Sequence, residues 1–189
     1  EHAPYSTKLI QALYNKGQLE LKKAESIEAK STASDSKLAN AFIQKAKDLF
    51  QEAADLGHRP SAASILNIEA NILFKDGKET EALEKCNQAL SLDSSNNESK
   101  FTKASIIYKT AKESSSDIVD TQDKYDQALI LLREIPYHNS KDKGYLLRKT
   151  LQDNLNKEIS LSICQNAKEA LNEVSGEMSL SIDELEPQI

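Results

Sequence analysis

Tryptophan is absent from this chain of 189 residues, which also has only five glycines, four prolines and one methionine. Aromatic residues make up 5% of the sequence, and no segment alternates apolar and polar residues as a half-buried strand does. A chain with few glycines and prolines has few helix breakers, so long helices are favoured. We therefore expect an all-α fold.

Long hydrophobic runs and an excess of basic residues are also missing. No apolar run approaches the ~20 residues that cross a bilayer, so we expect no direct insertion into a membrane. The formal net charge is −6, and residues 174–189 contain four acidic residues and no Lys or Arg. Without a basic stripe along the chain, we expect no binding to nucleic acid.

Cysteine and histidine are too sparse to form an obvious reactive centre. Cys86 and Cys164 both lie in apolar helical patterns, which predicts small core residues and a reducing, cytoplasmic location. His2, His58 and His138 stand far apart, and no pair has the spacing of metal ligands. The sequence also has no glycine-rich phosphate loop. We therefore predict a protein that is not an enzyme, with no catalytic residues, no metal and no cofactor.

Helical periodicity is what the chain has in abundance. Seven helices are predicted, and their expected ends coincide with breaks in the periodic pattern. A polar linker at 31–36 separates the first two, Gly57 ends the second in a left-handed conformation, and Pro60 suits the first turn of the third. The predicted ranges are 5–30, 37–56, 63–74, 82–92, 97–112, 120–135 and 140–171.

The last of these helices has an unusual apolar pattern. Its apolar residues recur at a fixed step of four, and each step drifts by ~40° around a helix of 3.6 residues per turn. Either this stripe changes partner along the helix, or the helix breaks near residues 156–160. We predict one helical domain at residues 1–173 and an acidic, disordered tail at 174–189, which alternatively acts as a peptide ligand. The apolar residues are Leu147, Leu151, Leu155, Ile159, Ile163, Ala167 and Leu171.

A repeating unit is visible at residues 63–96. A helix, a turn at Gly77 and a second helix make a pair that cannot bury its own apolar face, so stacked neighbours are implied. Three apolar positions of the second helix recur at an offset of 36 residues, and again at an offset of 46 that we attribute to an insertion near 114–116. The three sets are Ala46, Phe50 and Ala53; Ala82, Cys86 and Ala89; and Ala128, Leu132 and Ile135.

These spacings resemble the tetratricopeptide repeat family, and residues 46–62 are also similar to the related Sel-like repeat. The resemblance covers about residues 37–135 and implies a right-handed superhelix of antiparallel helix pairs, followed here by a long C-terminal helix. The unit at residues 63–96 departs from the family pattern at five positions. Where the family often has Trp, Gly, Tyr, Phe and Pro, this chain has, in the same order, Leu66, Ala70, Leu73, Cys86 and Ser94.

Members of this family bind peptides or partner helices in a concave groove lined by the first helix of each pair. The resemblance therefore implies a groove whose asparagines bind main-chain groups and whose aromatics anchor apolar side chains. Some members bind the C-terminal carboxylate of a partner with a set of Lys, Arg and Asn side chains. This set is incomplete here, because no Lys precedes Asn67 at the required position. The candidate groove residues are Ser64, Asn67, Asn71, Phe74, Glu98, Phe101, Ser105 and Tyr108.

The sequence thus predicts a non-enzymatic protein–protein interaction module, an adaptor, chaperone-like protein or assembly scaffold, with a protein or peptide as partner. The alternative is a structural or oligomerisation subunit. In that hypothesis the long C-terminal helix forms a homodimer or docks on another subunit.

Overall fold

A computed structural model describes residues 4–28, 33–113, 118–136 and 143–183. Every element in these ranges is an α-helix and none is a strand, which confirms the predicted all-α class. The chain divides into two compact units between Ile106 and Ile107, inside the range predicted as one domain. The helices are α1 (Pro4–Glu28), α2 (Ala33–Asp55), α3 (Arg59–Lys75), α4 (Glu79–Leu92), α5 (Asn97–Glu113), α6 (Ile118–Arg133) and α7 (Lys143–Asp183).

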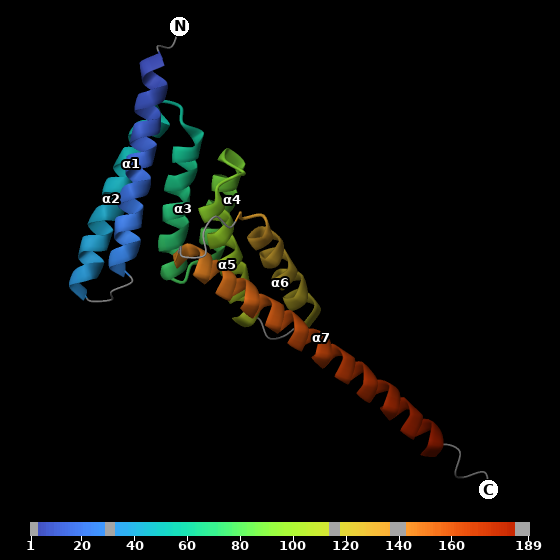
Figure 1. Ribbon diagram of the computed structural model, residues 1–189. Coiled ribbons are helices and arrows are strands. Elements are labelled where there is room, and N and C mark those ends of the chain that lie inside the picture. The colour runs from blue at the N-terminus through green and yellow to red at the C-terminus, as the bar shows by residue number, and fades with distance from the viewer. Residues whose placement is uncertain (1–3, 29–32, 114–117, 137–142, 184–189) are drawn as a thin grey trace. The chain divides into compact units, whose positions relative to one another are not determined.

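In the first unit, α1 and α2 lie side by side and α3 packs against α2 (Figure 1). Phe50 of α2 is fully buried between these helices, together with Ala46 and Ile68, and its ring centroid is 5.7 Å from that of Tyr14. Gly17 of α1 faces this ring so closely that an added Cβ would lie 2.5 Å from Phe50 Cε1. The missing side chain at Gly17 therefore allows α1 to approach α2.

The turns after α2 and α3 have the same construction. Gly57 and Gly77 have φ angles of +88° and +76°, which a residue with a side chain rarely adopts. Gly77 N–H donates to Phe74 O, and Lys78 N–H donates to Leu73 O, closing the end of α3. The two corresponding bonds close α2 at Gly57. The predicted left-handed end at Gly57 and the turn at Gly77 are confirmed.

The core between α3, α4 and α5 is built from small residues. Ala70, Ala82 and Cys86 are fully buried against Ile106 of α5. The three positions that recur along the sequence have the same environment in all three copies, because each of these nine residues has at most 1% of its surface exposed. Six of the nine are Ala or Cys, and these small side chains let neighbouring helices approach closely.

In the second unit, α6 packs against the N-terminal part of α7 (Figure 1). Tyr108, at the end of α5, contacts the buried Tyr125 of α6 with ring centroids 6.1 Å apart. Leu132 and Leu155 are fully buried in this unit. None of the described helices is long and apolar enough to cross a membrane.

Three predictions about local structure differ from what is observed. α2 begins at Ala33, because the small polar residues predicted as linker continue the helix, with Asp35 in its first turn. α7 is one unbroken helix, and it continues to Asp183 through residues predicted as a disordered tail. Cys164 is exposed, whereas the sequence predicted a core residue. The last residues of the predicted tail, 184–189, lie outside the described ranges.

Candidate functional site

The predicted groove residues of α3 are largely covered. Ser64 is 5% exposed and donates its hydroxyl to Pro60 O, and Asn67 is 7% exposed. α3 is packed on both sides, through Ile68 toward α2 and through Ala70 toward α4 and α5. Because neighbouring helices cover α3, these two polar side chains do not line an open groove. The prediction treated α3 as packed on one side only.

Asn71 and Phe74 are half-buried and take part in packing. Asn71 Nδ2 donates to Asn67 O, and Asn71 Oδ1 accepts a hydrogen bond from Thr102 Oγ1 at 3.3 Å. Phe74 packs against the cluster that contains Cys86. The asparagine that we expected to bind a peptide main chain is therefore engaged between α3 and α5.

The four predicted groove residues on α5 differ in exposure and belong to different units. Glu98 is exposed, Phe101 is half-buried, and Ser105 donates its hydroxyl to Phe101 O. Tyr108 belongs to the second unit, where it contacts Tyr125. The structure thus brings Asn71 close to α5 through Thr102 but does not assemble the eight predicted residues into one site.

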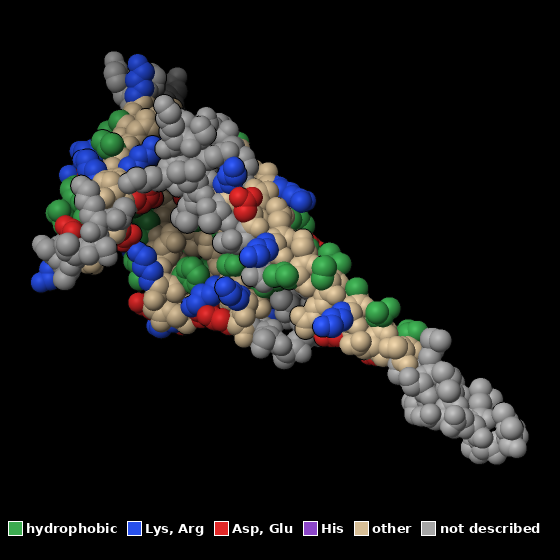
Figure 2. Space-filling model, turned by 60° about the horizontal axis from the view of Figure 1, so that its bottom comes forward, with side chains coloured by type: hydrophobic (Ala, Val, Ile, Leu, Met, Phe, Trp, Pro, Cys, Tyr) green, Lys and Arg blue, Asp and Glu red, His purple; other side chains and the backbone are tan. Residues whose placement is uncertain are grey.

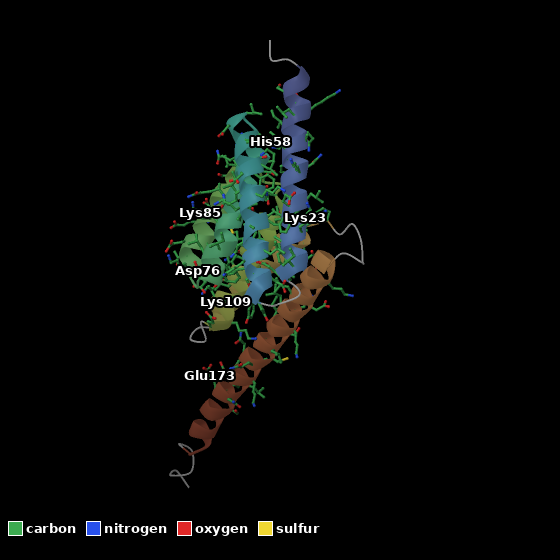
Figure 3. The ribbon with its side chains drawn as sticks, turned by 90° about the vertical axis from the view of Figure 1, so that its left-hand side faces the viewer. Lys23, His58, Asp76, Lys85, Lys109 and Glu173 are labelled. Carbon is green, nitrogen blue, oxygen red and sulfur yellow. The ribbon has the colours of Figure 1, made fainter. Side chains whose placement is uncertain are left out.

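A histidine and a serine lie together at the start of α3. The His58 ring meets the Tyr14 ring of α1 edge-on. His58, labelled in Figure 3, has its Nδ1 2.8 Å from Ser61 Oγ. This spacing is that of a nucleophile and its base. Ser61, however, is fully buried, and its N–H donates to His58 O in the first turn of the helix. Ser61 Oγ is therefore paired with the His58 ring inside the packed first turn, and a substrate has no access to the hydroxyl.

Ion pairs join successive helices of the first unit. Glu69 of α3 accepts a hydrogen bond from Lys85 of α4 at 2.8 Å and lies 3.5 Å from Lys47 of α2. The hydrogen bond from Lys85, with the nearby charges, lowers the pKa of Glu69 below its usual value. Glu69 therefore links α3 to both α2 and α4 by charge.

The second such pairing joins α1 and α2. Glu20 is 2% exposed and is bound by Lys23 at 3.0 Å and by Lys45 at 3.3 Å. The hydrogen bond from Lys23 is the main reason that the pKa of Glu20 is lowered. Its Oε2 is buried and has no hydrogen-bond partner among the described residues. This carboxylate lies inside the helix pair and links α1 to α2 through Lys45.

The cysteines differ sharply in environment. Burial raises the pKa of Cys86 to about 12, which leaves the thiol protonated. Cys164 lies on the exposed part of α7. Within the described ranges, no three His, Cys, Asp or Glu side chains are grouped so as to hold a metal ion.

Among the described residues the most exposed large apolar side chain, Leu171, lies on α7. The sequence proposed this helix as the alternative surface for self-association or subunit docking, without naming residues on it. Leu155 is fully buried and Ile159 is half-buried, but beyond them Ile163 is 57% exposed and Leu171 is 71% exposed. Figure 2 shows hydrophobic side chains on the surface along the C-terminal part of α7. The drift of the step-of-four pattern was the signal, because it moves the apolar residues off the packed side of the helix.

These residues form one continuous face. A helix turns by ~100° per residue, so Ile163, Ala167, Ala170 and Val174 lie within about 60° of the helix circumference. Leu171 lies at one edge of this arc. We call this set the α7 stripe: Ile163, Ala167, Ala170, Leu171 and Val174. All five are exposed.

The two borders of the α7 stripe differ in charge. Glu169 and Glu173 follow one border, one helical turn apart, and Figure 3 shows Glu173 on this part of the helix. Cys164 and Lys168 lie beyond the opposite border. Leu161, which is 54% exposed, lies on the far side of the helix from Ile163. The stripe is therefore a narrow apolar band between two polar borders.

Comparison with known proteins adds no assignment: no protein-family model matches the chain, and no curated protein or solved structure is significantly similar to it.

Proposed function

We propose that this chain is a non-enzymatic protein–protein interaction scaffold that docks a partner through α7. The observation that carries the proposal is the exposure of the α7 stripe, where Ile163, Leu171 and Val174 are each at least 57% exposed. An isolated helix in water is marginal, and most helical stability comes from covering an apolar face. A partner that covers this stripe therefore stabilises α7 and is bound in return. The sequence left two hypotheses, a groove that binds a peptide and a C-terminal helix that docks on another subunit. Docking through α7 develops the second.

The body that carries α7 is, in this proposal, a right-handed superhelix of tetratricopeptide-like helix pairs. Two features support it. The apolar trio is buried alike in each of its three copies, and the helices before Gly57 and Gly77 end in the same hydrogen-bond motif. We further propose a cytoplasmic location, in keeping with a free, exposed thiol at Cys164.

A second candidate function is peptide binding beside α3 and α5. The observation that favours it is the contact between Asn71 and Thr102, whose hydrogen bond is long at 3.3 Å. An extended peptide that offers a main-chain N–H to Asn71 Oδ1 replaces this weak bond with a stronger one. Phe101, half-buried on α5, then lies on a neighbouring helix as an apolar contact.

Crosslinking in cells followed by mass spectrometry tests both candidates. We expect wild type and a Leu161→Glu control to capture the same proteins, including other copies of this chain, and Ile163→Glu to lose the α7 partner. The control is matched because Leu161 and Ile163 are 54% and 57% exposed on opposite sides of α7. If Asn71→Ala alone loses a captured protein, the peptide site is supported. If Ile163→Glu captures the same proteins as wild type, docking through α7 is overturned.

A further inference from the structure

Four polar side chains form a layer between α3 and α5. Asn67 and Asn71 lie about one helical turn apart on α3, and Ser99 and Thr102 lie three residues apart on α5, so each pair shares one face of its helix. Asn67, Ser99 and Thr102 are each more than nine-tenths buried. Buried polar atoms cost free energy unless each has a hydrogen-bond partner, so the partners in this layer decide what it can hold.

One half of the layer is closed by a direct hydrogen bond, and the other half is not. Thr102 Oγ1 donates to Asn71 Oδ1 at 3.3 Å, and Asn71 Nδ2 donates back to Asn67 O. Asn67 Oδ1 and Ser99 Oγ, by contrast, are buried and have no hydrogen-bond partner among the described residues. The Ser99 N–H already donates to Asn96 Oδ1, so the unmatched group of this residue is its hydroxyl.

The directions of the helices place these two unmatched atoms at the same level. Residues 76–78 join α3 to α4 and residues 93–96 join α4 to α5, and connections this short reverse the direction of the chain. Arg59 at the start of α3 accordingly donates to Ser91 O at the end of α4. α3 and α5 therefore run in the same direction. About one turn back from their direct contact, Asn67 on α3 lies level with Ser99 on α5.

We propose that Asn67 Oδ1 and Ser99 Oγ hold one internal water molecule between α3 and α5. Water fits both groups at once, since it donates to the amide oxygen and accepts from the hydroxyl. Asn71 Oδ1 supplies a third partner, because its bond from Thr102 is long and an amide oxygen accepts two hydrogen bonds. Buried waters typically make about three hydrogen bonds.

The chemistry of the layer selects water over an ion. None of its four side chains is charged, and burial of an ion without an opposite charge is costly. Asn67, predicted as a groove residue, then belongs to a water-mediated contact that joins successive helices of the repeat. This inference is independent of docking through α7.

Two measurements on the full chain test for the water directly. A high-resolution crystal structure should show one solvent peak within about 2.7–3.2 Å of both Asn67 Oδ1 and Ser99 Oγ. In solution, ¹⁷O magnetic relaxation dispersion should count one long-lived water fewer in Asn67→Leu/Ser99→Ala than in wild type. Ser105→Ala is the matched control and should keep every water, because this hydroxyl donates to a carbonyl of its own helix. An unchanged count in the double variant overturns the inference, as does a direct bond between the two atoms.

Thermal unfolding tests whether the two residues share a partner. Ser99→Ala and Asn67→Leu should each lower the unfolding midpoint by about 3–6 °C, because each leaves a buried polar group incompletely bonded. The double variant removes both groups and should melt above either single variant, with circular dichroism confirming that all three are helical. Asn67→Leu combined with the control Ser105→Ala should show only additive shifts. A double variant of Asn67 and Ser99 that is less stable than both single variants contradicts a shared water.

Discussion

At the scale of single residues, Gly17 has the clearest consequence. Replacing a helical Gly with Ala usually stabilises a protein by about 0.5–1 kcal/mol. Here the new Cβ would lie 2.5 Å from the ring of Phe50, which is fully buried. Overpacking of this kind costs about 1–3 kcal/mol. We therefore expect Gly17→Ala to lower the free energy of unfolding by about 1 kcal/mol, measured by urea denaturation.

Two variants separate this clash from a general effect on α1. Lys16→Ala changes an exposed neighbour in the same helix and should leave the stability nearly unchanged. Phe50→Leu makes room for the new methyl group, so the cost of Gly17→Ala should fall in that background. An equal cost with Phe and with Leu at position 50 would show that the ring is not the cause.

The two thiols give a second prediction at this scale. Because burial raises the pKa of Cys86 to about 12, almost no thiolate is present at pH 8. Cys164 is exposed. We expect a disulfide reagent such as DTNB to modify one thiol rapidly in the folded chain and the second only after unfolding. Cys164→Ser should remove the rapid reaction, and a rapid reaction that persists in this variant would show that Cys86 is accessible.

At the scale of helices, Glu69 joins three elements and makes their packing sensitive to pH. The hydrogen bond from Lys85 lowers its pKa in the folded chain below the usual 4.5. A lowered folded pKa means that the stabilisation is present above pH 4.5 and is lost as the pH falls through the folded value. Glu69→Gln should therefore reduce the stability by about 0.5 kcal/mol at pH 7. The difference from wild type should shrink as the pH falls below 4.5 toward pH 3.

Thermal unfolding at the two pH values measures this difference. Glu52→Gln on the exposed side of α2 is the matched control and should match wild type at both. A difference between wild type and Glu69→Gln that is equally large at pH 3 would assign the effect to packing and contradict a role for the carboxylate charge.

Helix ends and buried positions were predictable where they depend on residues close in sequence, such as a glycine at a helix end or apolar residues at helical spacing. The glycines at 57 and 77 end helices as predicted, and the apolar trios are buried as their spacing indicates. The groove was not predictable, because burial of Ser64 and Asn67 depends on how closely α2, α4 and α5 surround α3. Such contacts between distant segments leave no periodic signal in α3 itself.

At the scale of the whole molecule, the two units differ in how completely their helices are covered. The first unit packs α3 on both sides, whereas α7 of the second unit leaves its core after Ile159. In the sequence, this exposed part of α7 was visible as an apolar pattern that drifts around the helix. The pattern allowed either a change of packing partner along the helix or a break near residues 156–160. The helix is unbroken, which excludes a break, and the apolar residues Ile163, Leu171 and Val174 beyond Ile159 are exposed in the described structure.

The exposed part of α7 should therefore be less stable than the rest of the molecule. Backbone amides of residues 160–175 lack tertiary cover, so hydrogen exchange there should be fast in dilute solution, while amides around Leu155 remain protected. Protection of residues 160–175 should rise when a partner that covers the stripe is bound to wild type. In Ile163→Glu these amides should stay unprotected when the same partner is added. Strong protection of 160–175 in dilute wild type would mean that the helix is stable alone, and the argument that α7 needs a partner would then fail.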